Sequence, residues 1–286
     1  MRALFLVPLL AASSLMAQQF HIDHVTVAGR NVQAMTTALK SVAGITAQYG
    51  GPHSNHATEM ALASFNDGSY LELIAIQPKA DPAALEAHEW RKFMESDAGP
   101  CAWAIRPAGF SDEVQRLRAA KIAVTDPRKN GRKRPDGVEL DWETAQVGPT
   151  NGGFFPFMIH DFTPRDNRAF PSGKPTTTEF AGVAQVVIGV KDLGAAIAQY
   201  RQAYGLPTPV RVQSMVLGAN IAAFPGTPVV LATPLSPESW LTDRLNRFGE
   251  APCAFVLSKG DGPVRFENIS WLDSAQLGWH LGIAGR

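Results

Sequence analysis

The sequence predicts an α+β protein built from tandem βαβββ modules, the last of them truncated. Two observations lead to this prediction. Short apolar runs of strand length alternate with amphipathic helix patterns, and part of this pattern is repeated in the second half of the chain. With 286 residues, 45% of them hydrophobic, the chain is long enough for one large domain or two of average size.

The first residues indicate export. Arg2 supplies a short positive region, Ala3 to Ala12 is an uncharged apolar run, and Ala17 is a small residue suited to cleavage. A membrane anchor would need about 20 apolar residues, and this run is shorter and contains Pro8. We therefore expect a signal peptide over residues 1–17 and a periplasmic or secreted protein.

The expected elements follow in order along the mature chain. Strand-sized apolar runs lie at 25–28, 70–76, 102–105, 154–159, 183–190, 220–224, 229–232 and 254–257. Apolar residues at helical spacing predict helices at 31–42, 111–120 and 192–204. Strands are in the majority.

An internal repeat divides the chain. The run from Gly99 to Ile105 recurs as Ala251 to Leu257, and the strand after His24 has a counterpart after Gln185. We expect a first domain of two modules over residues 18–165, a Pro-rich linker over 166–180 and a second, related half over 181–286. Too few residues follow Cys253 for a complete last module, so it is expected to be truncated.

The composition excludes several classes of partner. Lys plus Arg and Asp plus Glu both number 26, so no basic field exists to attract nucleic acid. No later apolar run is long enough to span a bilayer. The two cysteines, Cys101 and Cys253, are too few for a disulfide framework. We expect the protein to bind a small molecule, as substrate or ligand. We expect it to be a monomer or a homodimer.

Four segments carry a family resemblance: Asp23-His24-Val25, the strand from Tyr70 to Ile74, the run from Arg132 to Trp142, and Pro156 to His160. With them the chain resembles the glyoxalase-like domain family of the vicinal oxygen chelate superfamily, which includes glyoxalases and extradiol dioxygenases. The resemblance implies curved mixed sheets around a cavity. It does not determine the reaction, because one fold supports many chemistries.

The resemblance also implies a metal site. His24 on a first strand and Glu72 and His160 on fourth strands would hold a divalent ion, Fe, Mn or Zn, as two imidazoles and one carboxylate. Glu72 lies in an otherwise apolar strand, so a partner is expected for its charge. In place of a fourth ligand the sequence has Cys101 or Ala102, and we expect Cys101 to be a core residue. The second half lacks the site, because His24 aligns with Gln185 and Glu72 with Leu231.

Further residues are candidates for contact with a substrate. His56, Glu59 and Tyr70 are expected at or near the cavity mouth by the same resemblance. The basic run from Arg128 to Arg134 is expected to be a solvated turn, and its functional alternative is capture of a substrate carboxylate.

Two functions remain open at this point. The first is an exported metal-dependent enzyme, a lyase, isomerase or dioxygenase, that acts on a small substrate with vicinal oxygens. The alternative is a non-catalytic protein that binds or sequesters a small molecule on the same scaffold.

Overall fold

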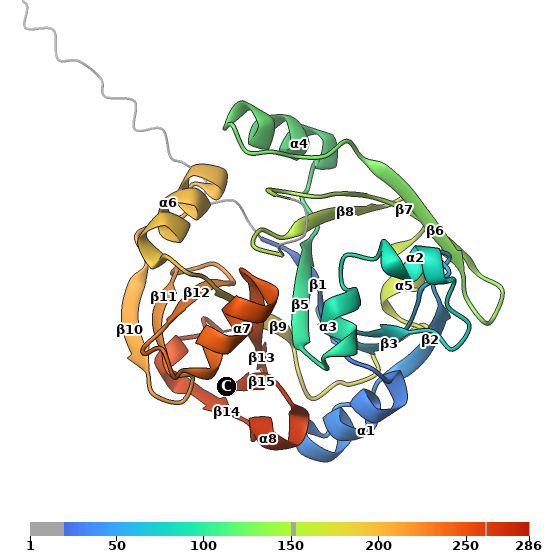
Figure 1. The fold of residues 1–286 in the computed structure, drawn as a ribbon. Coiled ribbons are helices and arrows are strands. Elements are labelled where there is room, and N and C mark those ends of the chain that lie inside the picture. The colour runs from blue at the N-terminus through green and yellow to red at the C-terminus, as the bar shows by residue number, and fades with distance from the viewer. Residues whose placement is uncertain (1–19, 150–152, 261, 286) are drawn as a thin grey trace, which may run out of the picture.

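The computed structural model describes residues 20–149, 153–260 and 262–285 and confirms the tandem βαβββ architecture, with two curved mixed sheets side by side (Figure 1). The first sheet has eight strands. They are β1 (Ile22–Ala28), β2 (Gln48–Pro52), β3 (Thr58–Ser64), β4 (Tyr70–Ile76), β5 (Gly99–Ile105), β6 (Arg128–Lys133), β7 (Glu139–Ala145) and β8 (Phe157–Asp161).

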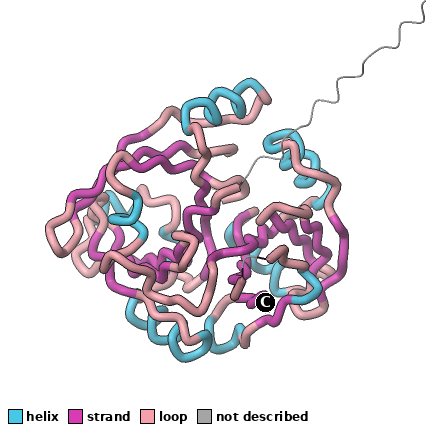
Figure 2. The backbone as a smooth tube through the Cα atoms, turned by 180° about the vertical axis from the view of Figure 1, so that it is seen from behind, coloured by secondary structure: helices cyan, strands magenta, loops and turns pink. Residues whose placement is uncertain are grey.

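The second sheet has seven strands, one fewer than the first, because the last module is truncated as predicted. They are β9 (Gly182–Gly189), β10 (Val210–Ser214), β11 (Ala219–Ala223), β12 (Val229–Pro234), β13 (Ala251–Ser258), β14 (Ile269–Trp271) and β15 (His280–Ala284). Figure 2 shows the molecule from behind, and the strands of the two sheets again form two groups.

The two sheets share one pattern of strand pairing. Strand β1 pairs in parallel with β4 and antiparallel with β5, which pairs in parallel with β8. Strand β9 pairs in the same way with β12 and β13, and β13 pairs in parallel with β15. The order β2-β3-β4-β1-β5-β8-β7-β6 thus has its counterpart in β10-β11-β12-β9-β13-β15-β14. The repeat found in the sequence is therefore a repeat of topology.

Helices connect the strands (Figure 1). The helices are α1 (Val32–Ala43), α2 (Pro82–Glu86), α3 (Arg91–Glu95), α4 (Phe110–Ala119), α5 (Arg165–Ala169), α6 (Leu193–Tyr204), α7 (Trp240–Phe248) and α8 (Ser274–Leu277), with a 3-10 turn at Phe266–Asn268. The three helices expected from the sequence correspond to α1, α4 and α6. None of the helices in the described residues is long and apolar enough to cross a membrane.

The repeated helices α1 and α6 begin and end in the same way. Asn31 and Asp192 each accept a hydrogen bond from a backbone N–H of the first turn. Gly44 and Gly205 end the two helices with φ of 70° and 64°, a left-handed conformation that glycine adopts without a steric penalty. Each of the two helices thus begins at a polar cap shortly after its strand, β1 or β9, and ends at a glycine.

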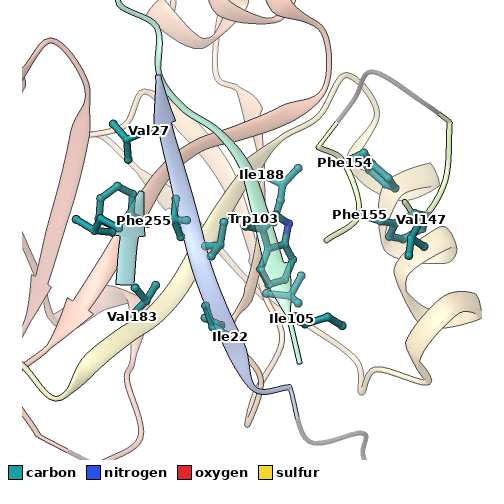
Figure 3. Close-up of a cluster of buried hydrophobic side chains, with 14 of the residues drawn as sticks. Ile22, Val27, Trp103, Ile105, Val147, Phe154, Phe155, Val183, Ile188 and Phe255 are labelled. Carbon is teal, nitrogen blue, oxygen red and sulfur yellow. The ribbon is translucent and has the colours of Figure 1, made fainter. Parts of the chain in front are cut away.

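The main core lies where the two sheets face each other. It contains alternate residues of the central strands from both halves, among them Val27, Trp103, Ile188 and Phe255, all with exposed fractions of 0% (Figure 3). Because strand side chains alternate between the two faces, the remaining residues of these strands point to the opposite, concave face of each sheet. The core thus determines which residues of β1 and β4 are available for function.

The structure also bears on four other predicted features: the signal peptide, the linker, the basic run and the two cysteines. Residues 1–17 lie outside the described residues, so the signal peptide stays a prediction. Within the stretch expected as a linker, Thr176 and Thr177 hydrogen-bond to the first half. The basic run, expected as a solvated turn, is instead strand β6. Cys101 and Cys253 are both buried free thiols.

Candidate functional site

The concave face of the eight-stranded sheet holds a cavity of about 600 Å³. Its walls come from β1, β3, β4, β6, β7 and β8 and from the segment between α2 and α3. The charged and titratable side chains that line it include His24, His53, Glu72, His88, Arg128 and Arg132. A volume of this size suits a small organic molecule.

Alternation along β1 and β4 places the candidate residues in the cavity. Glu72 lies opposite Thr26 in the parallel pair, and Thr26 Oγ1 donates a hydrogen bond of 3.1 Å to Glu72 Oε2. Val25 and Leu71 point instead into the core. Glu72 and His24 therefore share one face of neighbouring strands, as the family resemblance implied.

Glu72 lies between two imidazole rings. Its Oε2 is 3.7 Å from His24 Nε2, and its Oε1 is 3.4 Å from His53 Nε2. Both distances exceed those of an ordinary hydrogen bond. The side chain of Glu72 is 14% exposed and that of His53 17%, whereas His24 is only 5% exposed. The partner that a carboxylate in an apolar strand requires is thus a pair of histidines.

The other nitrogen of each ring is held by a neighbour. His24 Nδ1 is 2.6 Å from Asp23 Oδ1, and His53 Nδ1 is 2.8 Å from Thr58 Oγ1. The ring of His24 is also stacked on Tyr70, with 4.8 Å between the ring centroids. These contacts set the orientation in which both Nε2 atoms face Glu72.

A buried ion-pair network supports His24 from behind. Arg168 donates two hydrogen bonds of 2.9 Å to the carboxylate of Asp23, and it also binds Asp161 and the hydroxyl of Tyr70. Arg165 Nη2 is 3.1 Å from the same carboxylate of Asp23. Arg106 Nε lies 3.4 Å from Asp23 Oδ2 as well. Asp23 has an exposed fraction of 0%, and these three arginines together with His24 compensate its charge.

The electrostatics of the cavity follow from these contacts. Burial acts to raise the pKa of Glu72, but His53 and His24 outweigh it and hold the pKa at about 2. Burial likewise acts to raise the pKa of Asp23, and Arg168 together with His24 and Arg165 holds it well below its usual value. Burial lowers the pKa of His88, with a further contribution from His53. Glu72 and Asp23 are therefore carboxylates at neutral pH, and His88 is a neutral imidazole.

The structure does not bring His160 to the cavity. On β8 the residues Phe157 and Ile159 line the cavity, so His160 points to the other face. There its side chain is 49% exposed, and Nδ1 is 3.1 Å from Glu143 Oε1. Neighbouring residues of a strand point to opposite faces of the sheet, and the sequence did not determine which face of β8 His160 occupies.

The second module offers no metal ligand in place of His160. His24 lies opposite Ala104 on β5, and Ala104 lies opposite Phe157 on β8. Cys101 Sγ contacts the backbone oxygen of Thr26 at 3.6 Å, and burial raises its pKa well above the usual value. Across residues 20–149, 153–260 and 262–285, no group of three or more His, Cys, Asp or Glu side chains could hold a metal ion. The donor set predicted for Fe, Mn or Zn is therefore not assembled.

The predicted substrate contacts are divided between two faces. Tyr70 lies in the cavity wall, between His24 and Arg168. Glu59 lies on the other face of β3, where it accepts a hydrogen bond of 2.9 Å from Tyr49. His56 is an exposed loop residue that does not line the cavity. Of the three candidates, the cavity therefore contains Tyr70 alone.

The sequence indicated no site role for His53, His88 or Arg168, and for Arg132 it offered only the alternative that the basic run captures a substrate carboxylate. His53 was visible only as one of two histidines in a polar loop, and Arg132 as part of a basic run. The alternation of Arg128, Asn130 and Arg132 within that run is a strand signal that could have indicated a shared face. Nothing local in the sequence connects Arg168 to Asp23.

Comparisons with known proteins support the fold. A family model described as "Glyoxalase-like domain" matches residues 22–204. None of the curated proteins matches this sequence. A hypothetical protein from Staphylococcus aureus is similar in structure with a TM-score of 0.64 at 10% identity, over 94% of this chain and 100% of that one.

Two further solved structures are enzymes. A variant of 4-hydroxymandelate synthase from Streptomyces coelicolor matches with a TM-score of 0.55 at 10% identity, over 84% of this chain and 71% of that one. Methylmalonyl-CoA epimerase from Mycobacterium tuberculosis matches with a TM-score of 0.31 at 18% identity, over 38% of this chain and 90% of that one. At 10% identity the similarity to the synthase concerns the fold and not the reaction.

Proposed function

Because the chain belongs to the glyoxalase-like domain family, we propose that it is an enzyme that transfers a proton on a small, oxygen-bearing substrate in the cavity of the first half. The observation that carries this proposal is the ionised carboxylate of Glu72 between two imidazoles whose Nδ1 atoms are held by other residues. Such a set of coupled acid and base groups in a concave site is typical of proton-transfer enzymes.

The three side chains would have different roles. With a pKa of about 2, Glu72 is too weak a base to remove a proton from carbon at neutral pH. His53 is the more exposed of the two imidazoles and is the proposed proton carrier. Its Nε2 would take a proton from a carbon next to a carbonyl or carboxylate group, and Glu72 would stabilise the imidazolium that forms. His24, held by Asp23, would complete the polar side of the cavity.

Return of the proton determines the class of reaction. Return to the other face of the same carbon, or to a neighbouring atom, gives an isomer. Loss of a leaving group from the adjacent carbon before the proton returns gives the product of a lyase. Neither reaction requires an oxidant, a reductant or a second substrate. Vicinal oxygens on the substrate would suit the polar groups that surround Glu72.

Divalent metals are common in the vicinal oxygen chelate superfamily, and the sequence predicted one here. The residues present do not fit that prediction, because His160 lies on the other face and the second module presents Ala104 and Phe157. No step of the proposed reaction is therefore routed through an ion.

Exchange of carbon-bound hydrogen in D₂O tests the proposal. The purified protein is incubated with 2-hydroxy and 2-oxo acids that carry aliphatic or aromatic side chains, and loss of the C–H signal is followed by NMR. Removing a general base costs about 10²- to 10⁴-fold in rate, so His53→Gln should be slower by about this factor. Glu72→Gln should also be slower, because the imidazolium loses the charge that stabilises it. His160→Gln is the matched control, because this histidine lies outside the cavity, and its rate should stay within about twofold of the wild type.

The experiment includes the protein as purified, after treatment with EDTA, and with added Fe, Mn or Zn. Exchange that persists after EDTA and depends on His53 supports the proposal. Exchange that appears only with an added ion would show that the proposed metal-free step is wrong. No exchange on any acid, under any of these conditions, would favour the alternative of a non-catalytic binding protein.

A further inference from the structure

Strand β6 divides the basic run of the sequence between two faces. Arg128 and Arg132 both line the cavity, as residues four positions apart on one strand can. Lys129 and Lys133 are exposed, and Lys133 Nζ lies 3.9 Å from the carboxylate of Glu139 outside the cavity. The run that was expected to be a solvated turn thus presents two guanidinium groups to the cavity.

Arg132 is held in place by the backbone rather than by an ion pair with one of the described residues. Its Nη1 donates a hydrogen bond of 2.9 Å to the backbone oxygen of Gly50, which fixes the side chain against β2. No acidic side chain in the part of the chain that the structure describes forms an ion pair with it. Burial is the largest influence on the pKa of Arg132 and lowers it. The charge of Glu72 across the cavity partly offsets this effect, and the charges of Arg134 and Arg168 add to it. A half-buried cation of this kind is costly unless an anion joins it.

The other walls describe the rest of the ligand. Trp90, Trp142 and Phe157 line the same cavity and offer flat apolar surfaces. Glu72 and Glu89 line it as well, and their carboxylates would repel a ligand with several negative charges. The cavity therefore suits a single negative charge on an apolar or aromatic body.

We propose that Arg132 binds the carboxylate of a small organic acid whose apolar or aromatic body lies against Trp90 and Trp142. A guanidinium group matches a carboxylate because two parallel N–H donors meet its two oxygens. This inference rests on the proposed function, since it names the substrate class of the same cavity. With the carboxylate at Arg132, the adjacent carbon of the acid would be directed to His53 and Glu72.

Isothermal titration with phenylacetate and phenylacetamide tests this assignment. The two probes share one aromatic ring and differ in charge. A hydrogen-bonded charge pair is worth about tenfold or more in affinity, so the wild-type protein should bind phenylacetate at least about tenfold more tightly than the amide. Arg132→Gln should lose this preference. Lys133→Gln removes the same charge from the adjacent residue on the outer face and should keep it.

A second variant separates binding from folding. Arg132→Lys keeps the positive charge and should retain part of the preference, with circular dichroism of all variants unchanged. Inorganic phosphate at equal concentration should not displace phenylacetate. The proposal is overturned if neither probe binds, if the amide binds as well as the acid, if Arg132→Gln keeps the preference, or if phosphate displaces the acid.

The failures of the two proposals are distinguishable. Binding that depends on Arg132 without hydrogen exchange on any acid would overturn the proposed reaction alone. Hydrogen exchange that depends on His53 but is indifferent to Arg132→Gln would overturn the assignment of the carboxylate alone.

Discussion

The two halves have the same strand pairing, yet the concave face of the first sheet holds a cavity and that of the second is filled. In the second half, helix α7 lies against the sheet (Figure 1). Its Leu241 and Leu245 pack with Val187, Val230 and other buried side chains in one apolar cluster. In the first half the equivalent space borders His24 and Glu72. There helix α3 covers only part of the same face, where Phe93 and Met94 pack with Ile74, and the polar site lies in the space that remains.

Strand register shows how the second half lost the polar residues. Thr26 lies opposite Glu72 in the first sheet, and Val187 lies opposite Val230 in the second. The counterpart of Glu72 is thus Val230, and the sequence alignment with Leu231 was one residue out. Leu231 points into the main core. Either alignment gives an aliphatic residue, so the prediction that the second half lacks these charges holds.

The largest expected loss of stability concerns Asp23, a charged residue of the first half whose counterpart in the second half is Ala184. Asp23→Asn leaves the buried Arg168 and the half-buried Arg165 without a full countercharge, and breaking a buried ion pair costs about 3–5 kcal/mol of folding free energy. Urea unfolding measures the loss. The control is Asp243→Asn, which removes an exposed pair with Arg247 and should cost at most about 1 kcal/mol. Equal losses in the two variants would show that the network around Asp23 contributes little.

The filled face of the second half should be sensitive to a smaller side chain. Leu241 has an exposed fraction of 0%, and Leu241→Ala in a packed core costs about 2–5 kcal/mol. Met215→Ala is the control, because Met215 is 80% exposed and should change stability by less than about 0.5 kcal/mol. A loss below about 1 kcal/mol for Leu241→Ala, measured by denaturant unfolding, would mean that α7 does not fill this face tightly.

The polar face of the first half should make stability depend on pH. The pKa of Glu72 is about 2 in the folded protein against 4.5 ordinarily, so its stabilising contribution is present above about pH 4.5 and is lost as the pH falls towards 2. The contribution is at most about 3 kcal/mol. Unfolding at a series of pH values from 7 to 3 should therefore show a smaller acid-induced loss in Glu72→Gln than in the wild type.

The matched control for this measurement is Glu59→Gln, on the other face of the neighbouring strand β3. This variant should keep the acid-induced loss of the wild type. If Glu72→Gln and the wild type lose stability in parallel, the two imidazoles do not stabilise the carboxylate of Glu72.

The sequence by itself determined the modules, their repetition and the truncation of the last one, because these depend on local hydrophobic patterns and on caps such as Asn31 and Asp192. The placement of His24 and Glu72 in one cavity came from the family resemblance of the segments that contain them. Glu72 could be singled out because a charge in an apolar strand needs a partner.

Only the tertiary structure decided which residues complete the cavity. His53 and Arg168 reach it from segments outside β1 and β4, and His160 leaves it because the register of β8 turns that side chain to the outer face. A shift of one residue in a strand exchanges the two faces, and contacts between distant segments depend on how the whole sheet curves. Packing between such segments also decides how much of each concave face is covered, by α7 in the second half and by α3 in the first.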